Sequence, residues 1–235
     1  MVLFYFIKDR GLIKKLHGVR EVMDTAKEYS AFPRYMIFSD LSLNANQQLT
    51  PIMFASLYNS TIVGHYSLAN RILRLPNIVI TSSIANVFRN DAIDEIRIHN
   101  NCRDLYVSTL KKLFLMSFPV YLFLFILSPF VFKFVFGSEW ELAGNFGRII
   151  SIFLFVEFIA TPLNTLFYVR NKQRKLMILQ TINLFFSILM IVISAVIFQS
   201  PYFSLLLYSF NALLFNVLLL IYSYKLSKEH VQLFE

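Results

Sequence analysis

The sequence is poor in charged residues, cysteine and glycine. Only 15% of its 235 residues are Asp, Glu, Lys or Arg, while 57% are hydrophobic and the mean hydropathy is +0.58. A chain with so few charges cannot form the surface of a conventional soluble domain. The single cysteine, Cys102, excludes an intramolecular disulfide.

Sequence patterns that support nucleotide, metal or nucleophilic chemistry are also missing. The six glycines form neither a GxxxxGK[ST] nor a GxGxxG motif, so no phosphate-binding loop is predicted. The four histidines are scattered over predicted loops and tails, and no group of potential ligands has metal-site spacing. We therefore expect no catalytic residues, no metal and no cofactor, and a protein that is not an enzyme.

Long apolar runs dominate what remains, and each is close to the roughly 20 residues that cross a bilayer as a helix. Alternating strand patterns are absent, and in lipid the backbone must satisfy its own hydrogen bonds. The sequence thus predicts an all-α polytopic membrane protein, a bundle of six transmembrane helices at about 33–57, 66–88, 113–136, 147–169, 176–198 and 202–224.

The connections between the predicted spans alternate between basic and free of basic residues. Seven Lys or Arg lie in 8–34, five in 89–112, four in 170–175 and two in the tail from Lys225, while the other three connections have none. Eighteen of the 22 basic residues therefore lie on one side, which the positive-inside rule makes cytoplasmic. Topology and anionic lipid headgroups account for the net charge of +8 without nucleic acid.

The chain divides into three parts around these spans. Residues 1–32 comprise "MVLFYFI", which is typical of the end of a preceding helix, and a cytoplasmic amphipathic linker. The apolar positions of that linker, at helical spacing, are Leu12, Leu16, Val19, Met23 and Ala26. Residues 33–224 form the six-span lobe, and 225–235 form a cytoplasmic tail.

Polar residues recur along one face of several spans. The rows are Asp40, Asn44, Gln47 and Pro51 in the first span, Asn70, Arg74, Asn77 and Thr81 in the second, and Glu157, Thr161, Asn164 and Tyr168 in the fourth. A water-filled cavity and interhelical hydrogen bonding both explain the uncharged members. Interhelical bonding is the simpler explanation for the scattered polar residues of the last two spans, Gln180, Asn183, Ser187, Asn211 and Asn216.

The two arginines in the second span need a stronger reason, because a guanidinium in a bilayer costs about 2.5 kcal/mol or more. Arg71 lies beside the polar row, and Arg74 lies deeper, about 12 Å from the outer interface. Glu157 is at similar depth and is the predicted partner of Arg74. One interpretation is a structural ion pair; the other is a cationic cavity wall for an anionic substrate, since two arginines exceed one glutamate.

Prolines inside the predicted spans favour kinked helices. Each removes a backbone hydrogen bond, and broken helices are common at the binding level of transporters. Kinked packing without transport would produce the same pattern. The prolines are Pro51, Pro76, Pro119, Pro129 and Pro162.

Two elements together resemble a known family. The first, G-x-Y-x-x-A-x-R-x-x-x-x-P, is formed by Gly64, Tyr66, Ala69, Arg71 and Pro76, and the second, F-G-x-x-W-x-x-A-G, by Phe136, Gly137, Trp140, Ala143 and Gly144. With "FPRY" at the start of the first span, they are similar to the polysaccharide biosynthesis proteins. These are O-antigen repeat-unit flippases, in the superfamily of multidrug and toxin extrusion transporters.

The resemblance implies export of undecaprenyl-pyrophosphate-linked oligosaccharide across the bacterial inner membrane by alternating access. It covers the C-terminal half of a two-lobe flippase, so a separate N-terminal lobe or a second copy would supply the facing wall. The partners implied are the lipid-linked oligosaccharide and membrane lipids. We expect substrate contacts from Arg71, Arg74, Asn70, Asn77, Asn44 and Gln47, and ion coupling from Glu157 and Asp40.

Three alternatives remain open. A drug or cation antiporter of the same superfamily would favour acidic cavity residues over arginines. A membrane enzyme of glycan assembly would carry a large outer loop or a His/carboxylate site. A truncated, inactive remnant would have the same composition as an active lobe.

Overall fold

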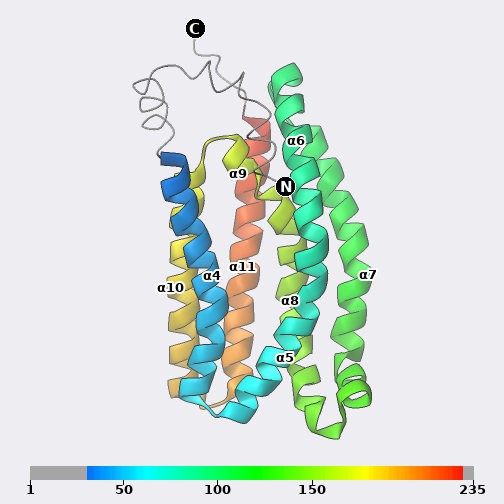
Figure 1. Ribbon diagram of the computed structural model, residues 1–235, viewed down its shortest axis with the longest axis vertical. Helices are drawn as coiled ribbons and strands as arrows, with labels where there is room; N and C mark the ends of the chain where they lie inside the picture. Colours follow the sequence, from blue (N-terminus) through cyan, green and yellow to red (C-terminus); the bar gives the residue numbers. More distant parts are fainter. Residues whose placement is uncertain (1–30, 230–235) are drawn as a thin grey trace, which may run out of the picture.

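The computed structural model describes residues 31–229, and within that range it contains helices and no strand (Figure 1). The predicted amphipathic linker and the end of a preceding helix lie outside the described residues. The elements are α4 (Ala31–Leu57), α5 (Ser60–Pro76), η1 (Asn77–Thr81), α6 (Ser82–His99), α7 (Arg103–Phe136), η2 (Ser138–Trp140), α8 (Glu141–Leu163), α9 (Leu166–Val169), α10 (Gln173–Phe198) and α11 (Pro201–Lys228).

Four helical segments are long and apolar enough to cross a membrane: α7, the stretch Ser138–Val169, α10 and α11. The helices that carry most of the intramembrane polar residues, α4 and α5–η1–α6, are not among them. Their Asn, Gln, Asp and Arg side chains lower the mean hydropathy of any window. The fold is that of a membrane-protein-like helical bundle.

The helices extend beyond the predicted spans at several ends. The third span, predicted from residue 113, belongs to a helix that begins at Arg103, and the fourth, predicted from residue 147, begins at Glu141. Helical hydrogen bonding continues through polar turns, so an apolar run marks only the central part of a helix. The fourth span also breaks after Leu163, one residue beyond Pro162.

The second predicted span is three elements rather than one. Pro76 ends α5, and the π-helical turn η1 follows before α6 continues. Proline lacks the N–H that the helix needs at this position, and a wider turn is one way to accommodate the loss. The bend between α5 and α6 is visible in Figure 1.

Helix α8 is the centre of the bundle and packs against α5, α7 and α11, while α4 packs mainly on α10 (Figure 1). The contact with α7 is the tightest, because a Cβ at Gly144 would lie 2.4 Å from the Pro129 Cα. The three connections without Lys or Arg lie together at one end of the bundle. The basic segments 89–112 and 170–175 lie at the other end (Figure 1). The first of them is predicted as a connection, but it is mostly helical: α6 continues to His99 and α7 begins at Arg103.

Candidate functional site

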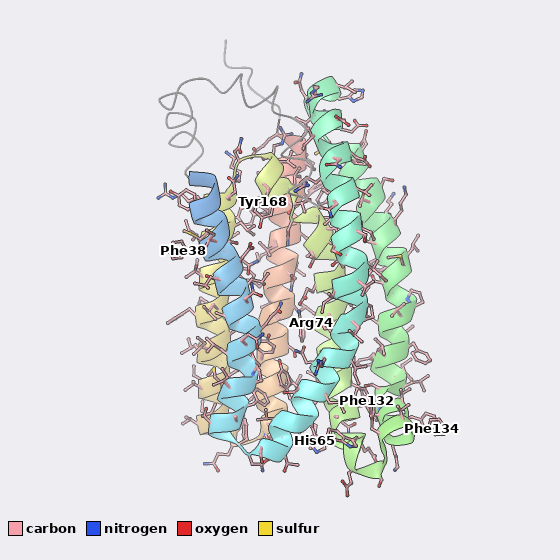
Figure 2. The ribbon with its side chains drawn as sticks, viewed as in Figure 1. Phe38, His65, Arg74, Phe132, Phe134 and Tyr168 are labelled. Carbon is pink, nitrogen blue, oxygen red and sulfur yellow. The ribbon has the colours of Figure 1, made fainter. Side chains whose placement is uncertain are left out.

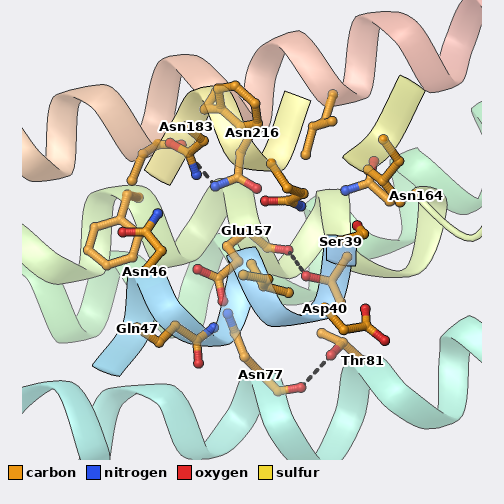
Figure 3. A pocket seen from close by; sticks show the side chains of 18 of the residues that line it. Ser39, Asp40, Asn46, Gln47, Asn77, Thr81, Glu157, Asn164, Asn183 and Asn216 are labelled. Carbon is orange, nitrogen blue, oxygen red and sulfur yellow. Dashed lines mark hydrogen bonds between the residues drawn. The ribbon is translucent and has the colours of Figure 1, made fainter. Parts of the chain in front are cut away.

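A polar cavity of about 410 Å³ lies inside the bundle between α4, the α5–α6 bend, α8, α10 and α11 (Figure 3). At its inner end lie Arg74, Phe153 and Tyr208. From there the lining continues along α8 to Thr161 and then to Tyr168 in α9, which lies near the basic end of the bundle (Figure 2). The cavity therefore extends from the middle of the bundle toward its basic end.

Aromatic side chains pack inside the bundle on the side of Arg74 that faces away from the basic end. The rings of Phe54 and Tyr66 stack with centroids 5.0 Å apart, and both side chains are buried. Nearby, the Tyr58 hydroxyl hydrogen-bonds to the Ser204 hydroxyl at 2.5 Å. None of these four residues lines the cavity.

Arg74 forms the predicted ion pair with Glu157. The Nη1 of Arg74 donates to Glu157 Oε1 at 2.5 Å, and the two side chains are 11% and 21% exposed. Its Nε donates to Asn70 Oδ1 at 3.4 Å, and its guanidinium carbon lies 6.0 Å from the centre of the Phe153 ring. The partner deduced from equal depth is confirmed, and both members of the pair line the cavity.

Asn77 sits at the first position of the π turn and has its side chain fully engaged. The amide donates to the Leu154 carbonyl at 3.4 Å, and its oxygen accepts from the Tyr121 hydroxyl. The Thr81 hydroxyl donates to the Asn77 carbonyl at 2.5 Å. Asn77 lines the cavity, but its bonds join the bend to α7 and α8.

On α4 the cavity-facing side differs from the predicted row. Asp40 and Gln47 line the cavity, whereas Asn44 is exposed and donates to the Asp40 carbonyl of its own helix at 2.7 Å. The lining instead includes Ser39 and Asn46, both buried. The spacing of the polar residues identified the correct helix. The predicted face is shifted by about one residue from the face that lines the cavity.

Arg71 also lies outside the cavity: it is exposed and does not line it. Asn70 contributes through its bond to Arg74 rather than as a lining residue. Among the described residues, the charged side chains that line the cavity are Arg74, Glu157 and Asp40. The expected surplus of positive charge is therefore wrong for these residues, which carry one positive and two negative formal charges.

Amides of α10 and α11 join the lining, although sequence reasoning assigned them to interhelical bonding. Gln180, Asn183 and Asn216 line the cavity. Asn183 also accepts a hydrogen bond from Asn211 at 3.0 Å, so it serves both purposes. Their four-to-three spacing with Leu176 and Ala212, which also line the cavity, is the signal that could have identified this wall.

Two further kinds of site, a metal site and a reactive cysteine, were sought among the described residues. Within it, no group of three or more His, Cys, Asp or Glu side chains is placed to hold a metal ion. Cys102 is buried just before α7, and its burial raises the pKa of the thiol to about 11. It does not line the cavity.

The two sequence elements noted above have structural roles. Tyr66 and Ala69 are buried on α5, and Ala143 and Gly144 lie buried where α8 meets α7. Gly137 ends α7 with φ +101°, a conformation that favours glycine. Both elements therefore help to place α5, α7 and α8 around the cavity.

An all-helical bundle with apolar, span-length helices around a polar cavity defines an integral-membrane class of protein. Residues 14–145, more than half of the chain, match the family model described as polysaccharide biosynthesis protein. The chain belongs to the polysaccharide biosynthesis protein family. Searches of curated proteins and of solved structures give no match.

Proposed function

We propose that the chain is one lobe of a flippase that exports undecaprenyl-pyrophosphate-linked oligosaccharide repeat units for O-antigen or a related surface polysaccharide. The single observation that carries this proposal is the polar cavity, which extends from the Arg74–Glu157 pair toward the basic end. Membership of the polysaccharide biosynthesis family supports it. A cavity that offers polar side chains inside an apolar bundle is what a glycan needs to cross a bilayer.

The proposal places six spans in the bacterial inner membrane, with α4 and the bent α5–η1–α6 segment as the two polar ones. Both flanks of the lobe are then cytoplasmic, because the basic connections at 89–112 and 170–175 share one end of the bundle. In this orientation the cavity faces the cytoplasmic side of the membrane. The lipid-linked precursor is in the cytoplasmic leaflet before export.

A facing wall completes the path for the substrate. We propose that it comes from an N-terminal lobe or from a second copy of this chain. Arg71 and Asn44 are exposed outside the cavity. Their substrate contacts are therefore proposed for the interface with that facing wall rather than for the cavity itself.

Asp40 and Glu157 are the proposed sites of ion coupling, because both are carboxylates in the cavity lining. A proton or cation that binds Glu157 would weaken its hold on Arg74 and release a donor for the substrate. Asn77 and Gln47 remain proposed contacts, and Gln47 has the freer side chain of the two.

The test is deletion of the gene, followed by measurement of lipid-linked oligosaccharide on each leaflet. The proposal predicts loss of surface polysaccharide and accumulation of the lipid-linked unit on the cytoplasmic leaflet, both reversed by the wild-type gene. Unchanged export after deletion would contradict it.

The charge of the cavity also favours a second candidate, a drug or cation antiporter. Two carboxylates and one arginine among its described lining residues suit a cationic substrate. Export of a cationic compound would increase its accumulation in the deletion strain and leave surface polysaccharide unchanged. The same strain thus distinguishes the two candidates.

A further inference from the structure

We propose that the cavity selects the sugar portion of the substrate and admits neutral or amine-bearing sugars while excluding acidic ones. The inference rests on the proposed function, because it assumes that the cavity holds a glycan. Its basis is the charge and hydrogen-bonding capacity of the lining.

The charge argument comes from the ion pair. Glu157 already compensates Arg74 at 2.5 Å, so the guanidinium offers little net attraction to a further anion. Asp40 lines the same cavity and adds a negative charge. A sugar carboxylate would leave water and meet this uncompensated charge, whereas an ammonium group would be attracted to it.

The hydrogen-bonding argument comes from the amides. Asn46, Gln47 and Gln180 line the cavity from α4 and α10, and their side chains make no hydrogen bond to another described residue. Each amide offers donors and an acceptor together. Sugar hydroxyls both donate and accept, so these side chains suit a neutral polyol better than an anion, which only accepts.

Apolar surface and size agree with a sugar. Phe215 and Tyr168 contribute rings to the lining, which can contact the C–H face of a pyranose. A volume of about 410 Å³ lies within the range of sites for small organic ligands and suits one or two sugar units. The diphosphate of a lipid-linked unit would then remain at the basic end, where Arg170, Lys172, Arg174 and Lys175 follow Tyr168.

Disaccharide binding to the full chain in lipid nanodiscs, measured by saturation-transfer NMR at pH 7, tests the inference. The probes are chitobiose as the neutral sugar, the glucosamine dimer as the amine and digalacturonate as the acid. We expect the neutral and amine probes to bind at least about tenfold tighter than the acid, equivalent to about 1.4 kcal/mol.

Two variants with matched controls sharpen the test. Asp40→Asn should reduce the discrimination against digalacturonate, whereas Asp91→Asn, at an exposed position of α6 outside the cavity, should not. Gln180→Leu should weaken chitobiose binding at least threefold, whereas Gln48→Leu, at an exposed position of α4 outside the cavity, should leave it unchanged. Thermal unfolding of each variant confirms that it is folded.

Digalacturonate binding as tight as chitobiose binding, or no binding of any probe by the folded protein, would overturn the inference. Selectivity unchanged in Asp40→Asn would overturn its electrostatic basis. The deletion strain reports on the flippase independently. Normal sugar export together with failed charge selectivity would reject this inference and leave the proposed function intact.

Discussion

At the residue scale, the Arg74–Glu157 pair dominates the energetics of the cavity. Each partner makes it possible for the other to remain charged inside an apolar bundle, because the pair is mostly withdrawn from water. The ion pair predicted from the sequence is thus confirmed. The pair nevertheless lines the cavity, so a structural role and a role in transport are compatible.

Replacement of one partner should be more harmful than replacement of both. Arg74→Ala leaves Glu157 unpaired, and we expect a loss of about 3 kcal/mol of stability and lower membrane abundance. Arg74→Ala combined with Glu157→Gln should recover most of that abundance, as measured by immunoblotting of membranes and by thermal unfolding. Equal abundance of the single and double variants would show that the pair contributes little to folding.

Cys102 provides a second test at this scale. Burial disfavours the thiolate and raises the pKa of its thiol from the ordinary value of 9.0 to about 11. At pH 8 the thiolate population is then about a hundredfold lower than in the unfolded chain, and alkylation should be slower by at least that factor. The rate of iodoacetamide labelling should keep rising with pH up to about 11 in the folded protein. Equal rates in folded and denatured protein would contradict the burial of Cys102.

At the element scale, the contact between α7 and α8 depends on two glycines of α8. A Cβ at Gly144 would meet the backbone of Pro129 and Ser128, whereas a Cβ at Gly147 would meet mainly the Ser128 hydroxyl. Backbone cannot move aside as easily as a hydroxyl. The two positions should therefore respond differently to the same substitution.

We expect Gly144→Ala to destabilise the bundle by about 3 kcal/mol or more and Gly147→Ala by about 1–2 kcal/mol. Ser128→Ala should relieve the Gly147→Ala defect, because without the hydroxyl the new Cβ at residue 147 would lie 3.4 Å from the Cβ of residue 128. It should leave the Gly144→Ala defect in place, because that contact is with backbone. A double-mutant cycle measured by thermal unfolding checks this. Rescue of both variants, or of neither, would contradict the packing.

The sequence predicts most of the helices and which of them carry polar residues. It does not predict correctly which face of α4 lines the cavity. Within residues 31–229, apolar runs located the long helices but missed the second half of α6, which is predicted as a connection. Equal depth identified the Arg74–Glu157 partnership. The choice of Asn44 over Asn46 failed because both positions fit a polar stripe, and only the packing of α4 on α10 decides which one is buried. Pro76 predicted a kink, whereas the π turn that follows it depends on the bonds of Asn77.

At the scale of the whole molecule, the proposed function requires six spans with the basic connections inside the cell. A Cys102→Ser background allows single cysteines to be introduced at exposed sites at each end of the bundle. Asn59→Cys and Ser138→Cys should react with a membrane-impermeant maleimide in whole cells, whereas Asn100→Cys should react only after permeabilisation. The reverse pattern would invert the topology, and labelling of all three sites would contradict six membrane spans.

In the proposed function, the polar cavity is part of the path of the exported glycan. Thr161 and Ile152 lie on the same helix, α8, but Thr161 lines the cavity and Ile152 is an exposed apolar residue outside it. A tryptophan at either position is tolerable on an accessible surface, but at residue 161 it would occupy cavity volume.

The decisive measurement is the amount of lipid-linked oligosaccharide on the cytoplasmic leaflet in deletion strains that carry Thr161→Trp or Ile152→Trp at wild-type abundance. If the glycan passes through the cavity, Thr161→Trp should cause the lipid-linked oligosaccharide to accumulate and surface polysaccharide to be lost, whereas Ile152→Trp should leave export normal. Normal export by both variants would show that the glycan does not pass through this cavity.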